Sequence, residues 1–227
     1  MHIAFLLFPQ VTQLDLTGPA QVLSRMGDGT RLDLVAATRD PVSTDAGFAI
    51  LPTATFADVP KADILCVPGG FGTNAAIADD RTIDWVRQLG LNAEWVTSVC
   101  TGSLILGAAG LLEGYRATCH WGQRHMLPLF GATPVSERVV IDRNRVTGGG
   151  VTAGIDFAFR LMALIRGEAH ARMVQLSLEY DPDPPFDSGS PEHADIALVD
   201  AYQRRVAKLA PGRDDELRRL AALRNYP

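Results

Sequence analysis

The chain has 227 residues, of which 47% are hydrophobic and 21% are charged. These proportions are typical of a compact folded protein and exclude a disordered chain, and the length suits one α/β domain spanning residues 1–227. The 21 Lys and Arg residues are outnumbered by 26 Asp and Glu residues, which gives a net charge of −5. Because an acidic protein does not attract phosphate backbones, we expect no nucleic-acid partner.

The first apolar run, residues 1–9, is too short to span a membrane and carries neither a basic leader nor a small-residue cleavage site. We interpret it as the first core strand and expect no membrane partner. The three cysteines, Cys66, Cys100 and Cys119, form no metal-type pair and leave an odd number for disulfides. We therefore predict free thiols, no metal and a cytoplasmic location.

Short apolar strands alternate with helical patterns through the first hundred residues, which is typical of βαβ units. The segment 41–52, with Gly47 near its middle, fits either a hairpin or an irregular excursion. Strands are predicted at residues 3–8, 32–37, 64–68 and 95–99, and helices at residues 14–26 and 81–89.

The same alternation continues to about residue 164. The pattern predicts a three-layer α/β/α sandwich with a mostly parallel central sheet. In such sheets ligands bind beyond the carboxyl ends of the strands, where Gly69, Cys100 and Gly148 all fall. Further helices are predicted at residues 101–112 (ended by Gly114), 120–129 and from 148–150 through 164, with strand pieces at 139–142 and 146–147.

Beyond Tyr180 the composition changes to a stiff, proline-rich loop that cannot be a helix or a central strand. Helices are predicted after it at residues 193–208 and 214–224. We call residues 181–227 the C-terminal extension and expect it to be a loop and helical appendage to the single domain.

Cys100 lies where an apolar strand ends and a run of small residues, Thr101, Gly102 and Ser103, begins a helix. A strand-to-helix turn exposes the side chain at its corner, and the first free N–H groups of the helix favour a thiolate. The sequence therefore predicts a reactive nucleophile at Cys100. The alternative is a cysteine that fills a gap at a strand end.

Asp15 follows the first strand and is flanked by the apolar residues Leu14 and Leu16. Partial burial, and a nearby thiolate, would raise the pKa of its carboxyl group and suit it to donate protons. The alternative is a helix N-cap before Pro19, because aspartate is favoured there.

Glycines follow two further strands. Gly69 and Gly70 could present free backbone N–H groups to an anion or oxyanion, as could Gly149 in the glycine run at 148–150 and Val151 directly after it. Turn formation is the alternative at both places. The spacing does not match a dinucleotide-binding fingerprint.

His120 comes directly after Cys119, close to a predicted strand end. It could act as the base of a cysteine–histidine pair, or it could only pack or begin a helix. His125 lies five positions further on, so the two histidines do not share a helix face as a metal pair would.

Five segments of the chain together resemble the ThiJ/PfpI superfamily. A sixth segment, at residues 175–180, resembles the bacterial isocyanide hydratases within that superfamily. The resemblance implies a flavodoxin-like, class-I glutamine amidotransferase-like fold. The segments are Leu14-Asp15-Leu16-Thr17-Gly18-Pro19, Val67-Pro68-Gly69-Gly70, Ser98-Val99-Cys100-Thr101-Gly102-Ser103, Ala117-Thr118-Cys119-His120-Trp121 and Gly148-Gly149-Gly150-Val151-Thr152-Ala153-Gly154-Ile155-Asp156, with Gln175-Leu176-Ser177-Leu178-Glu179-Tyr180 in the tail.

This resemblance implies that Cys100 is the nucleophile, that Asp15 and Thr101 complete the active site, and that the protein is a homodimer without a cofactor. It further implies hydration of a small neutral isocyanide to an N-substituted formamide through a covalent thioimidate. Peptidase-like relatives carry histidine at the position of Thr101, which argues against proteolysis.

Two other functions remain open within the superfamily. A redox sensor or stress protein would use the same cysteine. A ligand-sensing regulator domain would be followed by a DNA-binding domain, for which we expect no room before Pro227 and no suitable charge.

Overall fold

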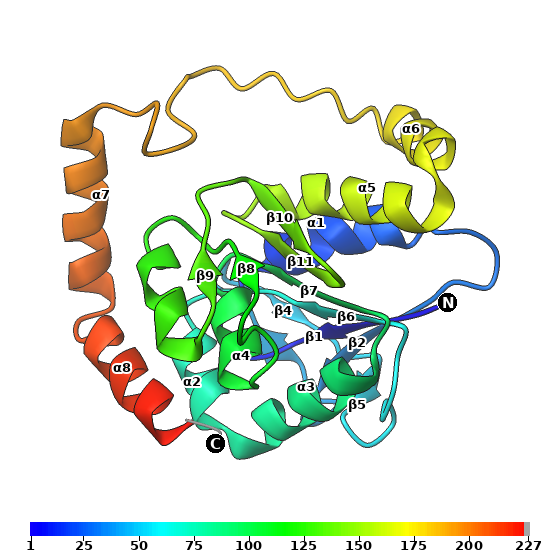
Figure 1. Ribbon diagram of the computed structural model, residues 1–227, viewed down its shortest axis with the longest axis horizontal. Coiled ribbons are helices and arrows are strands. Elements are labelled where there is room, and N and C mark those ends of the chain that lie inside the picture. The colour runs from blue at the N-terminus through cyan, green and yellow to red at the C-terminus, as the bar shows by residue number, and fades with distance from the viewer. Residues whose placement is uncertain (225–227) are drawn as a thin grey trace.

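The computed structural model describes residues 1–224. Its centre is a seven-stranded sheet in the order β10-β11-β7-β6-β1-β2-β5, in which only β10 is antiparallel to its neighbour (Figure 1). The predicted strands are present, and the two-residue strand β5 was not predicted. The strands are β1 (His2–Leu6), β2 (Arg31–Ala36), β5 (Ala54–Thr55), β6 (Ile64–Val67), β7 (Trp95–Val99), β10 (Val139–Asp142) and β11 (Arg145–Gly148).

Helices cover both faces of this sheet, which confirms the three-layer α/β/α prediction. In Figure 1, α1 (Gln13–Leu23) and α5 (Ala153–Arg166) lie above the sheet. Below it lie α2 (Thr73–Ala78), α3 (Asp80–Asn92) and α4 (Gly102–Ala108). Because both faces are covered, the central strands are apolar throughout, and all four residues of β6 are buried.

The register of the parallel strands places three loops at one edge. Val67 of β6 pairs with Ser98 of β7, and Gly148 of β11 pairs with Val99. The residues that follow these strands therefore leave the sheet side by side at its carboxyl edge. The first loop after β1 joins them, because β1 pairs with β6.

Two predicted helices differ from those observed. Helix α4 ends at Ala108, because Gly110 (φ 73°) turns the chain there before Gly114 is reached. The segment after His120 forms a 3-10 helix, η1 (Arg124–Phe130), instead of a helix over residues 120–129. Pro128 within η1 has no N–H to donate, which favours this tighter and shorter form.

Several short elements lie outside the predicted strands and helices. The segment 41–52 is a hairpin of β3 (Val42–Ser43) and β4 (Ala49–Ile50), one of the two forms expected. Helix α2 and helix α6 (Glu168–Ser177) are additional. A small parallel pair, β8 (Arg116–Ala117) with β9 (Thr133–Pro134), lies outside the main sheet.

The C-terminal extension crosses the molecule as an irregular segment and then forms α7 (Ile196–Leu209) and α8 (Arg213–Leu223) (Figure 1). Helix α7 has no buried residue, whereas α8 buries Leu217, Leu220 and Ala221 as it packs against α2 and η1. The extension is thus held at its far end. Within residues 1–224, no helix is both long and apolar enough to cross a membrane.

The two leucines of α5 should differ sharply in their contribution to stability. Leu161 is fully buried, whereas the side chain of Leu164 is exposed. We expect Leu161→Ala to lower the free energy of unfolding by about 2–5 kcal/mol, because it leaves a cavity in the core. Leu164→Ala, the matched control, should change it by about 0.5 kcal/mol or less. Urea unfolding measures both, and equal effects would contradict the packing described here.

Candidate active site

Cys100 occupies the corner between β7 and α4, as predicted. Its backbone is left-handed (φ 57°), a conformation that side chains other than glycine adopt rarely and that is typical of strained functional turns. Its N–H group is held by the carbonyl oxygens of Gly148 (3.0 Å) and Gly149 (2.7 Å) on the neighbouring loop. The turn is therefore fixed from the β11 side.

Small residues allow a second loop to approach the same turn. A Cβ atom on Gly69 would lie 2.5 Å from both the backbone nitrogen and Oγ1 of Thr101. A Cβ atom on Gly102 would collide with the carbonyl oxygen of Val67. Glycine at both positions lets the end of β6 pack directly against the start of α4.

Asp15 lies in the first turn of α1, with 1% of its surface exposed. Because α1 begins at Gln13 and contains Pro19, the alternative of an N-cap before Pro19 is wrong. Asp15 Oδ2 accepts a hydrogen bond from Gly69 N (2.9 Å), and no N–H or O–H donor within residues 1–224 reaches Oδ1.

The carboxyl group of Asp15 lies beside the thiol of Cys100. Burial raises the pKa of Asp15 to about 7, although the Gly69 N–H group and the Cys100 side chain both favour its ionised form. A carboxyl group with this pKa can accept and return a proton near neutral pH.

The expected lowering of the thiol pKa is wrong. Burial raises the pKa of Cys100 well above its usual value, and the negative charge of Asp15 adds to this effect. Hydrogen bonds from Thr101 act in the opposite direction but are weaker. Helix α4 is only seven residues long, so its dipole does not offset the cost of burying a thiolate.

Thr101 connects the turn to the Gly69-Gly70 loop. Its hydroxyl oxygen accepts a hydrogen bond from Gly70 N (3.0 Å) and shares another with the hydroxyl of Thr73 (2.7 Å). The side chain is buried. Its geometry is that of a residue that positions the turn.

The backbone N–H groups predicted to hold an anion are mostly occupied. Gly69 donates to Asp15, Gly70 donates to Thr101, and Gly149 donates to the carbonyl oxygen of Arg138 (2.9 Å). The anion-binding interpretation of these three is therefore wrong. Val151 lines the cavity beside Cys100, and within the described chain its N–H group has no acceptor.

His120 also faces this cavity but is not bonded to Cys100. Burial, helped by the positive charge of Arg213, lowers the pKa of His120 to about 4, so the ring is neutral at pH 7. Its Nδ1 accepts a hydrogen bond from Gly122 N (3.2 Å), and its ring stacks on Trp121. Of the two candidate partners, the structure thus brings Asp15 and not His120 to the thiol.

The cavity beside Cys100 has a volume of about 190 Å³. Part of its wall comes from the C-terminal extension, which the sequence analysis did not connect with the site. Tyr202 and Val206 of α7 and Arg213 of α8 all line it. No local motif marks residues that reach the site from a hundred positions away.

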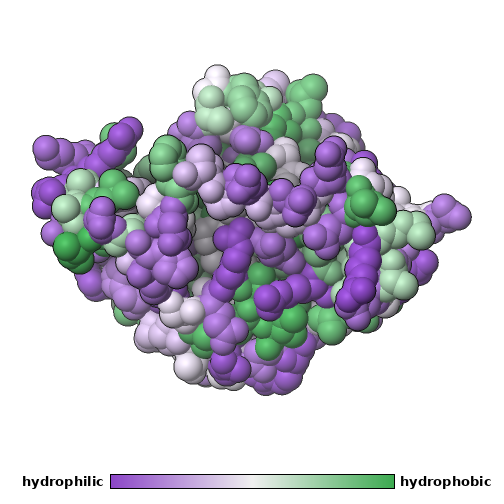
Figure 2. All heavy atoms as spheres, turned by 90° about the horizontal axis from the view of Figure 1, so that it is seen from above, coloured by the Kyte–Doolittle hydropathy of each residue, from purple (hydrophilic) through white to green (hydrophobic). Residues whose placement is uncertain are grey.

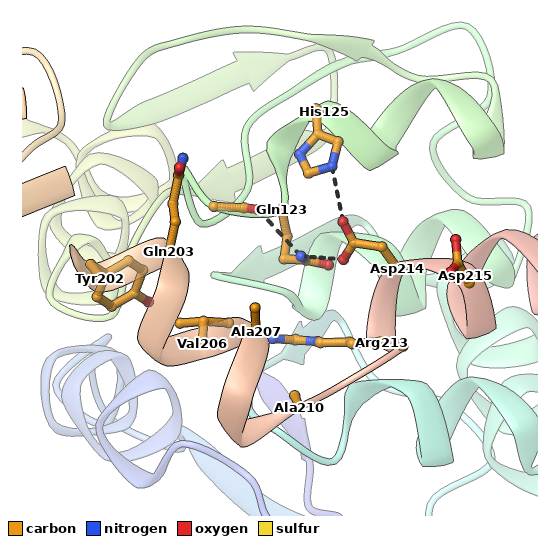
Figure 3. Close-up of a pocket in the computed structure, with 12 residues that line it drawn as sticks. Gln123, His125, Tyr202, Gln203, Val206, Ala207, Ala210, Arg213, Asp214 and Asp215 are labelled. Carbon is orange, nitrogen blue, oxygen red and sulfur yellow. Dashed lines mark hydrogen bonds and ion pairs between the residues drawn. The ribbon is translucent and has the colours of Figure 1, made fainter. Parts of the chain in front are cut away.

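A larger cavity of about 370 Å³ adjoins the first between η1, α7 and α8 (Figure 3). Gln123 and His125 enter it from η1 and its preceding turn, and both contact Asp214 of α8, at 2.8 and 3.3 Å. Within residues 1–224, no group of three or more His, Cys, Asp and Glu side chains is placed to hold a metal ion.

Comparison with known proteins assigns the family. Residues 1–164 match the model of the DJ-1/PfpI family. The chain is 51% identical over 225 residues to the isonitrile hydratase of Pseudomonas putida, an alignment that covers 99% of this chain and 98% of that enzyme.

Two further relatives extend the comparison. The crystal structure of a ThiJ/PfpI family protein from Pseudomonas syringae superposes with a TM-score of 0.91 at 45% identity, covering 97% of this chain and 90% of that one. The HTH-type transcriptional regulator CdhR of Pseudomonas aeruginosa is 31% identical over 78% of this chain and 53% of the regulator.

The raised pKa of Asp15 makes stability depend on pH. Both states of the protein hold the proton below about pH 4, but between the usual value of 3.8 and about 7 only the folded state does, so stability falls as pH rises through this window. We expect the free energy of unfolding of Asp15→Asn to rise by about 4 kcal/mol relative to that of the wild type between pH 4 and pH 8. Urea unfolding at a series of pH values measures both.

Asp33 provides the control, because it is also buried but hydrogen bonds from His2 and Thr53 outweigh burial and lower its pKa. Asp33→Asn should therefore lose stability relative to the wild type as pH rises through the acid range. A pH-independent difference between Asp15→Asn and the wild type would contradict the assignment.

Proposed function

We propose that this chain, which belongs to the DJ-1/PfpI family, hydrates isonitriles to N-substituted formamides. The observation that carries the proposal is the buried pair of the Asp15 carboxyl and the Cys100 thiol at the edge of a small cavity. The 51% identity with an isonitrile hydratase over nearly the whole of both chains supports the same activity.

In the first half of the reaction, the Asp15 carboxylate takes the thiol proton as Cys100 Sγ bonds to the terminal carbon of the isonitrile. That carbon then carries a lone pair, and Asp15 returns the proton to it. The product is a thioimidate in which carbon is bonded to sulfur, to hydrogen and, doubly, to nitrogen. A carboxyl group with a pKa near 7 suits both transfers, because neither of its forms is strongly favoured.

In the second half, a water molecule adds its oxygen to the thioimidate carbon and a proton goes to nitrogen. The carbon–sulfur bond then breaks, the thiolate regains a proton, and the formamide leaves. Asp15 is again the group placed to carry these protons. The unpaired N–H group of Val151 can donate to the new oxygen, whereas the N–H groups of Gly69, Gly70 and Gly149 hold the loops in place.

Thr101 acts as a positioning residue in this scheme, because its hydroxyl holds the loop that orients Asp15. The pKa of His120 is lowered to about 4, so its ring binds a proton only weakly, and it serves as an auxiliary donor in the cavity rather than as a base. The cavity volume of about 190 Å³ suits a small substrate.

The other functions have weaker support. Oxidation requires thiolate character and exposure, whereas Cys100 is 6% exposed and its pKa is raised, so a redox sensor is not favoured. The regulator CdhR matches over only about half of its own length. That match supports a shared domain and not a shared regulatory role.

We further propose one domain spanning residues 1–227, with the C-terminal extension as its appendage, in a cytoplasmic homodimer. The return of α8 to α2 supports the single domain, and three free cysteines support a reducing compartment. The homodimer follows from the resemblance to the superfamily, and exposed apolar side chains, some of which are visible in Figure 2, offer surface that a second copy could cover. Exposed examples lie on α6 (Met173, Leu176) and α7 (Ile196, Leu198).

Hydration of cyclohexyl isocyanide, followed by the loss of its absorbance, tests the proposal. We expect turnover by the wild type and none by Cys100→Ala, because no bond to carbon can form. Asp15→Asn should be slower by about 100-fold or more, the usual cost of losing an acid–base group.

Cys66→Ala is the matched control, since Cys66 is a buried thiol of β6 that the scheme does not use. It should keep turnover close to that of the wild type. Absence of turnover by the wild type would refute the proposed function, and full turnover by Cys100→Ala would refute the covalent route alone.

A further inference from the structure

Arg213, the first residue of α8, lies on the boundary between the two cavities. It lines both the 190 Å³ cavity beside Cys100 and the 370 Å³ cavity that adjoins it. In Figure 3 its side chain runs from α8 toward Val206 of α7, across the space between the two helices. A molecule that extends from Cys100 into the larger cavity passes this guanidinium group.

The guanidinium group has no carboxylate partner among the described residues. Its Nε atom is buried without a hydrogen-bond acceptor in the described part of the chain, and its guanidinium carbon lies over the ring of Phe71, 5.9 Å from the ring centroid. The three acidic residues that follow it on α8 are bonded elsewhere: Asp214 to Gln123 and His125, Asp215 to Arg218, and Glu216 to Asn74.

An unpaired donor in a cavity wall is costly unless a ligand satisfies it. The planar guanidinium group matches the two oxygens of a carboxylate more closely than any other side chain does. A second donor supports the same ligand chemistry. Nδ1 of His120 accepts from Gly122, so the neutral ring carries its proton on Nε2 at the edge of the same cavity.

Three carboxylates line the two cavities and oppose an anion. Asp214 and Asp215 line the larger cavity, where they are bonded to neighbouring side chains. Asp45 also lines the smaller cavity, but its residue is exposed to solvent and its carboxylate accepts a hydrogen bond from Thr12 Oγ1 (2.6 Å). Water screens such a charge, whereas the buried Nε of Arg213 is shielded from water. The balance favours binding of an anionic group at Arg213.

We propose that the preferred substrates are isonitriles whose substituent carries a carboxylate, which Arg213 binds while the isocyano carbon lies against Cys100. This proposal rests on the proposed function and narrows it from neutral isonitriles in general. Arg213 is then the residue that selects the substrate, and the C-terminal extension places Arg213 beside the cavity.

The test compares kcat/KM for a short and a longer isocyano carboxylate, each beside its own methyl ester. For the wild type we expect at least one carboxylate to exceed its ester by about tenfold or more, the usual scale of a hydrogen bond to a charged group. Arg213→Gln should lower that ratio by about tenfold or more, and Arg213→Lys should give an intermediate ratio because it keeps the charge but loses the planar pair of donors.

Arg218→Gln is the matched control, because Arg218 lies on the same helix, is exposed and pairs with Asp215. It should leave both the ratio and the activity unchanged. Equal rates for carboxylates and esters in the wild type, or an unchanged ratio in Arg213→Gln and Arg213→Lys, would overturn the inference while leaving the hydratase intact. Hydration of cyclohexyl isocyanide but of none of the four compounds would also overturn the inference, whereas failure to hydrate all five would refute the proposed function.

Discussion

The buried contact between the Asp15 carboxyl and the Cys100 thiol is the constraint on which the site depends. Both groups are almost inaccessible to water, and one N–H group, that of Gly69, is the backbone donor that compensates the carboxylate. Burial raises the pKa of both groups, and the charge of Asp15 raises that of Cys100 further, so the pair carries one negative charge at most near neutral pH. The site is thus built to move one proton between sulfur, carboxylate and substrate, and it does not hold a permanent thiolate.

The fold supplies this contact through three adjacent parallel strands. Asp15 follows β1, Gly69 follows β6 and Cys100 follows β7, and these strands pair in that order. On the β11 side of the site, the carbonyl oxygens at the end of β11 and in the loop after it accept hydrogen bonds from the N–H group of Cys100. Because glycine at positions 69 and 102 allows backbone to approach backbone, the carboxyl edge of the sheet can hold a left-handed cysteine and a buried acid within one small volume.

Sequence reasoning reached the parts of the site that follow from strand topology. The turn at Cys100 was visible as an apolar strand followed by small residues, and the rule that ligands bind at the carboxyl edge brought Asp15 to the same place. Prediction from the sequence failed for features of the site that depend on solvation or on distant segments of the chain. The direction of the Cys100 pKa shift depends on how deeply the thiol is buried, and the use of the glycine N–H groups depends on which acceptors reach them. Tyr202 and Arg213 enter the cavity from an extension whose path after the proline-rich loop no local pattern specifies.

The titration of Asp15 itself tests this account most directly. Infrared difference spectra between wild type and Asp15→Asn, recorded across the acid and neutral range, isolate the carboxyl stretching band of this one residue. We predict that the protonated band persists to neutral pH and disappears with a midpoint near pH 7. A midpoint near 4, the ordinary value for aspartate, would show that the carboxyl group is solvated and would contradict the shared-proton pair.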